Sequence, residues 1–290
     1  MSTLAKPFPS SREGRQRPRW VSGLFWYALL LLASLFTVLP FLWLLMTALK
    51  GPSDAVFSMP PQFIPREPTL GNFARVWSQL PIWRFFLNSL FVAALTVTLN
   101  VLVSSLAAYP LAKMNFPGRE PIFYALLATL IVPAELAYIP GYILAVNVFK
   151  YYDTLWALIF PNVFSAFNIF LLRQAYKGVP NDLIDAARID GAGELRIWWG
   201  VLMPTIRPAV ATAAVFTAVT SWNALLWPSL MLRNRELYTL PVGLLALRGM
   251  FTSDFRLIAA GAIMVIIPIL IAFLFAQRYF VAGLSGAVKG

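Results

Sequence analysis

The 290-residue chain contains no cysteine and no histidine. Without these residues it has no disulfide, no thiol nucleophile, no imidazole base and no ordinary zinc site. Charged residues make up only 12% of the sequence, and no Gly-x-x-x-x-Gly-Lys-Ser/Thr phosphate-binding loop is present. The sequence therefore offers no means of binding ATP, and we expect the chain to hold no metal and no cofactor of its own.

Hydrophobic residues dominate what remains. They account for 59% of the sequence, and the mean hydropathy is +0.72, which excludes an ordinary soluble fold. The net charge is +11. The basic residues are scattered between apolar runs and form no dense stripe, so membrane orientation explains them better than nucleic-acid binding does. We predict an all-α polytopic membrane protein whose surroundings are lipid, with no nucleic-acid partner.

Six runs nearly free of charge are each long enough to cross about 30 Å of hydrocarbon as a helix. The first run exceeds the apolar core of a cleaved signal sequence, about 7 to 15 residues, so we expect it to be retained. Residues 1–20 are basic and proline-rich, which predicts a flexible tail. The predicted spans are residues 23–49, 86–111, 121–144, 154–174, 206–231 and 257–278, within one transmembrane domain of residues 21–290.

The basic residues also predict an orientation. Successive connections between the six spans lie on alternate sides of the membrane, and most of the 23 Lys and Arg residues then lie on the same side as the N-terminus. The side richer in Lys and Arg is the cytoplasmic one, so both termini are expected in the cytoplasm. The proline-rich segment 51–83 then forms a partly ordered outer cap with a short helix over residues 71–78. Prolines inside spans, such as Pro133 and Pro161, predict kinked helices around a central pathway.

One cytoplasmic connection, residues 180–204, differs from the rest of the chain, and we call it the elbow. From residue 182 it reads DLIDAARIDGAGELRIWWGVLMP. This pattern predicts a short helix over 183–188, a sharp exit where Gly191 takes the left-handed conformation, and a second short helix over 194–202. Acidic side chains outnumber basic ones here, so we expect the elbow to dock on protein and not on anionic lipid.

The elbow resembles the coupling loop of binding-protein-dependent ABC importer permeases. That pattern is Glu-Ala-Ala, three residues, Gly, nine residues, then Ile-x-Leu-Pro. In this chain Asp185 replaces the Glu, which shortens any contact by one methylene, and Val201 and Met203 replace the Ile and Leu. The resemblance assigns coupling to a separate ATPase to Asp182, Asp185, Ala186, Ala187, Asp190, Gly191, Ala192, Glu194 and Pro204.

Other segments resemble the carbohydrate branch of the same family, in the shorter subunit of its maltose-type pair. They are Asn88-Ser89-Leu90, the run AAYPLAK ending at Lys113, FPGR ending at Arg119, Trp222-Asn223, and the C-terminal GLSGAVKG. The similarity covers residues 20–290. It implies the type I ABC importer permease fold, with six transmembrane helices and a cytoplasmic coupling helix.

The resemblance also implies partners and a location. The partners are a second homologous permease, two ABC ATPase subunits that bind ATP and Mg²⁺, and an extracytoplasmic solute-binding protein. The location is a bacterial cytoplasmic (inner) membrane. The expected substrate is a di- or oligosaccharide, with glycerol phosphate or another small polar solute as the alternative. The tail after Arg278 either reaches the ATPase or is a plain solvated end.

Polar side chains inside the spans are candidates for the substrate path, because an unsatisfied polar group in hydrocarbon costs several kcal/mol. The alternative for each amide is a hydrogen bond that joins two helices. Trp222 offers a face for a sugar ring, although most tryptophans serve packing. The candidates are Glu135, Asn100, Asn162, Asn168, Trp222 and Asn223.

Two other functional classes compete with the importer. An ion-coupled secondary transporter needs ionisable groups within the membrane, and Glu135 is the only charged residue away from the ends of the predicted spans. A membrane-embedded transferase needs a carboxylate pair or a metal site. The acids of the elbow could supply carboxylates, but an Ala-Ala pair and an Asp-Gly turn at this spacing serve no such chemistry.

Overall fold

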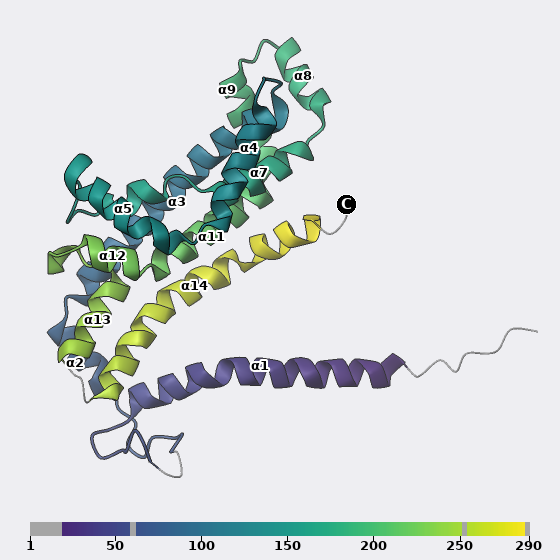
Figure 1. The fold of residues 1–290 in the computed structure, drawn as a ribbon. Coiled ribbons are helices and arrows are strands. Elements are labelled where there is room, and N and C mark those ends of the chain that lie inside the picture. Colours follow the sequence, from purple (N-terminus) through teal and green to yellow (C-terminus); the bar gives the residue numbers. More distant parts are fainter. Residues whose placement is uncertain (1–18, 59–61, 251–253, 288–290) are drawn as a thin grey trace, which may run out of the picture.

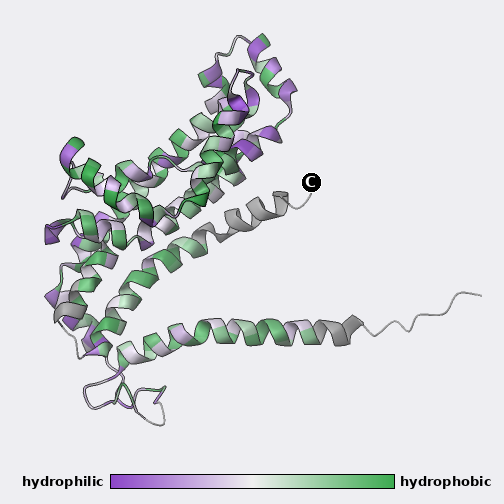
Figure 2. Cartoon of the chain, viewed as in Figure 1, coloured by the Kyte–Doolittle hydropathy of each residue, from purple (hydrophilic) through white to green (hydrophobic). Residues whose placement is uncertain are grey.

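The computed structural model describes residues 19–58, 62–250 and 254–287, and within these ranges every regular element is a helix (Figure 1). Three helices are long and apolar enough to cross a membrane unaided. They are α1 (Arg19–Leu49), α3 (Ile82–Lys113) and α14 (Phe255–Ala287). Figure 2 shows that hydrophobic residues predominate along all three. The all-helical fold predicted from composition is confirmed for the described residues.

Three bent pairs of helices pass the same test of length and composition when each pair is taken together. The total then reaches six, the number predicted from the sequence. The pairs are Arg119–Ile131 with Ala134–Val148, bent by 97°; Trp156–Asn162 with Ala166–Lys177, bent by 43°; and Glu194–Thr205 with Arg207–Asn223, bent by 85°. Pro133 stands at the first break, and Val132 before it is extended, as expected for a residue that precedes proline.

The bent pairs are made of short elements. The first contains α4 (Arg119–Ala128), η1 (Thr129–Ile131), η2 (Ala134–Ala137), α5 (Tyr138–Ile143) and η3 (Leu144–Val148). The second contains α6 (Trp156–Ile159), η4 (Phe160–Asn162) and α7 (Ala166–Lys177). The third contains α9 (Glu194–Ile197), η5 (Trp198–Leu202), α10 (Met203–Thr205) and α11 (Arg207–Asn223). The remaining elements are α2 (Gly71–Gln79), α8 (Asn181–Ile189), α12 (Leu226–Met231), η6 (Arg235–Leu237) and α13 (Leu240–Met250).

Helix α3 lies at the centre of the fold and packs along both α7 and α11. Its inward face carries small and polar residues, among them Ser104, Ser105 and Ala108, none of which is exposed. Small side chains let neighbouring helix backbones approach closely in a membrane, where apolar surface alone gives no preference for protein over lipid. The three helices therefore form the rigid unit that carries the elbow at one end.

The predicted outer cap has an ordered base. Lys50 is 1% exposed and donates a hydrogen bond to the carbonyl of Ala55 at 2.8 Å. The carboxylate of Asp54 accepts from the backbone N–H of Gly51 and of Arg66, each at 3.2 Å. Helix α2 occupies the stretch for which a short helix was predicted. The charged groups of Lys50 and Asp54 are thus satisfied within this proline-rich connection, close to the ends of α1 and α14.

Three predicted spans differ from the observed helices. The stretch 154–174 is interrupted between Asn162 and Ala166, where its two parts meet at 43°. The stretch 121–144 is broken at Pro133 and is not one straight helix. The stretch 206–231 is interrupted after Asn223, where Ala224 is extended and α12 starts a new direction. Absence of charge marks apolar surroundings but does not show where the backbone turns. The flexible tail predicted for residues 1–20 lies outside the described residues, apart from the two residues that open α1.

Candidate functional site

The elbow stands at one end of the molecule, opposite α2 and α13 (Figure 1). Its first helix, α8, follows Pro180 and carries Asp182 in its first turn, where a carboxylate is favoured by the positive end of the helix dipole. Ile184 is 3% exposed and anchors α8 to the buried cluster beneath it. The rest of α8 is largely exposed, so this short helix leaves its outer surface accessible.

Gly191 ends α8 in the way the sequence predicts. Its φ is +79°, and the backbone N–H of Ala192 donates to the carbonyl of Ala187 at 2.9 Å while that of Gly191 donates to Arg188 at 3.0 Å. These two bonds form a Schellman cap. A Cβ built on Gly191 would meet nothing within 4 Å, so the requirement for glycine comes from the backbone angle alone. The predicted left-handed exit is confirmed.

Ion pairs hold the two helices of the elbow together. Arg188 in α8 donates to Glu194 in α9 through Nε at 3.1 Å and Nη2 at 2.9 Å, and lies 3.5 Å from Asp185. The second oxygen of Glu194 accepts a hydrogen bond from the hydroxyl of Tyr109 in α3. The Tyr109 hydroxyl, together with Arg188, holds the pKa of Glu194 below its usual range. The carboxylate of Glu194 therefore stays ionised and links the elbow to the membrane-embedded body.

A second set of contacts continues this link into α3. The rings of Tyr109 and Tyr176 meet edge to face, with centroids 6.2 Å apart. The hydroxyl of Tyr176 lies 2.5 Å from the Ser105 hydroxyl, which accepts a hydrogen bond from the Trp198 indole N–H at 2.9 Å. Ser105 is fully buried. Residues of α3, α7 and the elbow are thus joined by polar groups in an interior where each would otherwise be costly.

The outer surface of the elbow combines charge with apolar side chains. Asp182, Asp185 and Asp190 are exposed. Beside them, Ile189 is 87% exposed and Leu195 is 70% exposed. Exposed apolar residues of this size, edged by carboxylates, are typical of a protein-binding surface. Of the remaining predicted coupling residues, Ala186 is exposed, while Ala187, Ala192 and Pro204 are half-buried.

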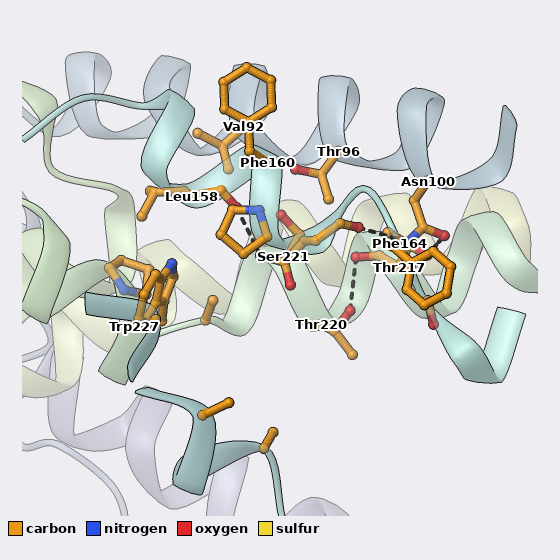
Figure 3. Close-up of a pocket in the computed structure, with 18 of the residues that line it drawn as sticks. Val92, Thr96, Asn100, Leu158, Phe160, Phe164, Thr217, Thr220, Ser221 and Trp227 are labelled. Atoms are coloured by element: carbon orange, nitrogen blue, oxygen red, sulfur yellow. Dashed lines mark hydrogen bonds between the residues drawn. The ribbon is translucent and has the colours of Figure 1, made fainter. Parts of the chain in front are cut away.

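A cavity of about 1060 Å³ lies between α3, α11 and the two broken segments that include η2–η3 and α6–η4 (Figure 3). Its walls are apolar, aromatic and uncharged polar side chains. At the cavity wall, the side-chain N–H of Asn100 donates to the backbone carbonyl of Asn162 at 2.7 Å, and its side-chain oxygen accepts from Asn168 at 2.6 Å. Asn168 also donates to Thr217 at 2.8 Å. This network fixes the broken segment against α3 and α11.

The family of binding-protein-dependent transport system inner membrane components matches residues 14–285, nearly the whole chain. This chain belongs to that family. The resemblance drawn from the elbow and the other segments is therefore confirmed at the level of the family.

Relatives and a solved structure extend the comparison. The arabinooligosaccharides transport system permease protein AraQ of Halalkalibacterium halodurans is 37% identical over 79% of this permease and 82% of its own length. The diacetylchitobiose uptake system permease protein NgcG of Streptomyces coelicolor is 32% identical over 89% and 86%. A chain of a bacterial ABC transporter involved in import of the acidic polysaccharide alginate has a TM-score of 0.79 at 24% identity, covering 95% of this permease and 100% of that chain. The last comparison confirms the predicted fold.

The predicted path residues divide into two groups. Asn100 and Asn162 line the cavity, and Asn168 lies behind them in the same network. Glu135 sits between two lining residues of η2 but is itself exposed away from the cavity, and it pairs with no described residue. Asn223 is exposed at the end of α11 and does not line the cavity.

Trp222 also lies away from the cavity, so the prediction that it stacks on a sugar is not supported by its position. It is 7% exposed, its indole N–H donates to the carbonyl of Val265 at 3.3 Å, and its ring meets Phe86 edge to face. Its role here is packing between α11, α14 and α3. The tryptophan on the cavity wall is Trp227.

Hydroxyl groups on the cavity wall escaped the sequence reasoning. Thr96 lies one turn from Asn100 on α3, and Thr217 and Ser221 lie one turn apart on α11. Positions four apart share one face of a helix, so this spacing was the available signal. Among the described residues, no group of acidic side chains is placed to hold a metal ion.

Proposed function

We propose that this chain is the membrane-spanning permease subunit of an ATP-driven, binding-protein-dependent importer. It carries a sugar, of the di- or oligosaccharide class, across the cytoplasmic membrane of a bacterium, with both termini in the cytoplasm. The family match and the sugar-transport relatives support this function. The solved relative supports the same fold. The excess of basic residues on the side of the N-terminus supports the orientation.

The observation that carries the proposal is the surface of the elbow. The chain has no phosphate-binding loop, so ATP and Mg²⁺ belong to separate subunits. Helix α8 projects an exposed Ile189 among carboxylates, while its cap and its bonds to Glu194 keep it rigid. We infer that Asp182, Asp185, Ala186 and the turn at Gly191 dock on an ATPase subunit, and that ATP-driven movement of that subunit shifts the elbow.

The exposed apolar helices support a second permease subunit. Helices α1 and α14 lie together at one end and diverge toward the other (Figure 1). Leu31 and Phe36 of α1 are 73% and 80% exposed. We propose that a homologous permease fills this side and closes the pathway, that two ATPase subunits lie beneath the pair, and that an extracytoplasmic binding protein delivers the sugar. Lipid covers the remaining apolar surface.

An ion-coupled secondary transporter is a weaker alternative. Its coupling ion requires an ionisable group on the transport path. Glu135, the one carboxylate within the predicted spans, does not line the cavity. The importer mechanism needs no such group, because its free energy comes from ATP.

The cap of α8 gives a direct test. Gly191→Pro removes the N–H that bonds Arg188 and demands a negative φ, while Gly191→Ala keeps the N–H but strains the left-handed angle by about 1–2 kcal/mol. Both variants should reach the membrane. Gly191→Pro should lose co-purification with the ATPase and vanadate-sensitive uptake, and Gly191→Ala should show a partial loss.

Gly193→Ala is the matched control. Gly193 has a φ of −72°, which any residue adopts, and nothing lies within 4 Å of its added Cβ. It should behave as the wild type. If Gly191→Pro binds the ATPase and transports normally, α8 is not the coupling element. Because the chain has no cysteine, Ile189→Cys introduces a single site for a crosslinker on the surface of α8. Crosslinks from this site to lipid alone would contradict docking on the ATPase.

A further inference from the structure

The cavity wall contains no charged side chain. Twenty-three residues of this permease line the cavity, and none is Asp, Glu, Lys or Arg. A carboxylate or phosphate that enters a membrane cavity loses hydration, and this loss is large unless a cation pairs with it. The wall offers an anion no such partner. An uncharged solute loses only hydrogen bonds, which amides and hydroxyls on the wall replace.

Several of those hydrogen-bonding groups have no partner within the described residues. Thr217 and Thr220 donate to carbonyls one turn earlier on α11, but Ser221 beside them makes no such bond. The side-chain N–H of Asn162 donates to the carbonyl of Leu158 at 2.8 Å, and its side-chain oxygen Oδ1 accepts no hydrogen bond from a described residue. Figure 3 shows Ser221 between Trp227 and Asn100. Ser221 and Asn162 thus present a donor and acceptors to the cavity.

Thr96 carries a further unused group. It is 1% exposed, and its hydroxyl oxygen has no hydrogen-bond partner among the described residues. Thr98 on the same helix, which is exposed, donates to the carbonyl of Ala94 at 2.8 Å in the usual way. An unsatisfied buried hydroxyl is destabilising. Rotation about χ1 exchanges its hydroxyl and methyl groups, and a ligand hydroxyl at the wall would then satisfy it.

Two aromatic rings form a fixed corner of the same cavity. Trp227 and Tyr138 have ring centroids 5.7 Å apart at 41°. The Trp227 indole N–H donates to the carbonyl of Ala157 at 2.9 Å, which holds the ring in place. Gly141 leaves room for this ring, because a Cβ there would lie 3.2 Å from it. Apolar and aromatic walls with a few placed polar groups are typical of small-molecule sites.

We propose that this wall is a binding subsite for an uncharged saccharide and that it disfavours acidic sugars and phosphate esters. The hydroxyls of the sugar bond Ser221 and Asn162, and its apolar ring face lies on Trp227 and Tyr138. This inference rests on the proposed importer function and narrows its substrate class. It separates this permease from the alginate importer of similar fold, whose substrate is acidic, and disfavours glycerol phosphate as the solute.

The test uses the complete importer, with both permeases and both ATPases, in lipid nanodiscs. Calorimetric titration compares neutral trisaccharides of glucose, arabinose and N-acetylglucosamine with a galacturonic acid trisaccharide. At least one neutral probe should bind about tenfold or more tightly than the acidic one. Ser221→Ala and Asn162→Ala should each weaken that binding about five- to tenfold, as expected for one lost hydrogen bond.

Two controls make the outcome specific. Ser229→Ala removes an exposed serine hydroxyl on α12 that bonds its own helix, and Thr98→Val removes an exposed hydroxyl on α3. Neither should change binding. Equal or tighter binding of the acidic trisaccharide, or no effect of both cavity variants, would overturn the proposal. ATP-dependent uptake and ATPase co-purification are measured on the same preparation. Absence of both would contradict the importer function, whereas an altered sugar preference with both intact would contradict only the neutral subsite.

Discussion

Removal of one hydroxyl group, in Tyr109→Phe, should loosen the elbow without unfolding the permease. Tyr109 is 3% exposed and donates to Glu194, whose other oxygen binds Arg188. Phenylalanine keeps the ring and its edge contact with Tyr176. The carboxylate keeps its arginine and its access to water, because the Glu194 side chain is 45% exposed. The variant therefore removes one contact between α3 and α9 and leaves the hydrophobic packing in place.

The magnitude follows from the kind of bond that is lost. A hydrogen bond to a charged group contributes about 1.5–3 kcal/mol when buried. Partial exposure of Glu194 puts this one at the lower end, about 1.5 kcal/mol. Since about 1.4 kcal/mol is a factor of ten, the balance between docked and released elbow should shift about tenfold toward release. A shift of that size changes coupling far more than it changes overall folding.

The assay compares ATP hydrolysis with solute uptake by the reconstituted importer. Tyr109→Phe should keep ATPase co-purification and hydrolyse more ATP for each solute imported. Tyr124→Phe is the control, because that side chain is 64% exposed and donates no hydrogen bond to a described residue. An unchanged ratio of hydrolysis to uptake would refute the reasoning, and so would complete loss of assembly.

The pKa of Glu194 adds a pH test to the same variant. The pKa of Glu194 is lower in the folded protein than in the unfolded chain, so the bond to Tyr109 stabilises the fold above the usual pKa of a glutamate. This stabilisation is lost as the pH falls through the folded pKa. The difference in melting temperature between wild type and Tyr109→Phe should therefore be full at neutral pH and should shrink below about pH 4.5. A difference that is constant with pH would show that the carboxylate is not the partner.

Two further predictions concern packing and a buried cation. Gly243→Ala should lower the free energy of unfolding by about 1–3 kcal/mol in a detergent melt, because the new Cβ would lie 2.2 Å from the ring of the fully buried Phe85. Arg173→Lys should lower the melting temperature more than Glu120→Gln does. The reason is that the guanidinium of Arg173 donates to the carbonyl of Leu111 at 2.9 Å and to the carboxylate of Glu120 at 2.6 Å. The ammonium group of a lysine cannot make both bonds in this planar geometry. Equal losses of melting temperature in Arg173→Lys and Glu120→Gln would contradict this explanation.

The elbow could be predicted because its signals are local. Glycine adopts the left-handed conformation at a helix end without a Cβ clash, and Gly191 occupies that region as expected. The sequence also placed the second helix at residue 194, where α9 begins. Its ties to the body could not be predicted, because Tyr109 lies 85 residues from Glu194 in the sequence. Nothing in the spacing of either residue indicates the other.

The cavity was predicted less well, for a different reason. The amides Asn100, Asn162 and Asn168 are conspicuous in apolar spans, and all three gather near one wall. Serine and threonine are less conspicuous, since their hydroxyls usually bond the preceding turn and so cost little in a membrane helix. Trp222 shows the remaining difficulty. Which side of a helix faces the cavity depends on its rotation. In α11 the hydroxyls of Thr217 and Ser221 mark that side, and the large ring of Trp222 does not.

Helix α3 brings the elbow and the cavity into one physical unit. Its buried polar residues form two pairs at i,i+4 spacing, Asn100 with Ser104 and Ser105 with Tyr109. Asn100 and Tyr109 are nine residues apart, or about 14 Å along the axis. The Ser104 hydroxyl donates to Asn100 at 3.4 Å at the cavity end, and Tyr109 binds Glu194 at the elbow end. On the proposed coupling mechanism, movement of the elbow either carries α3 with it or breaks the bond to Tyr109, and the first course transmits work to the cavity through α3.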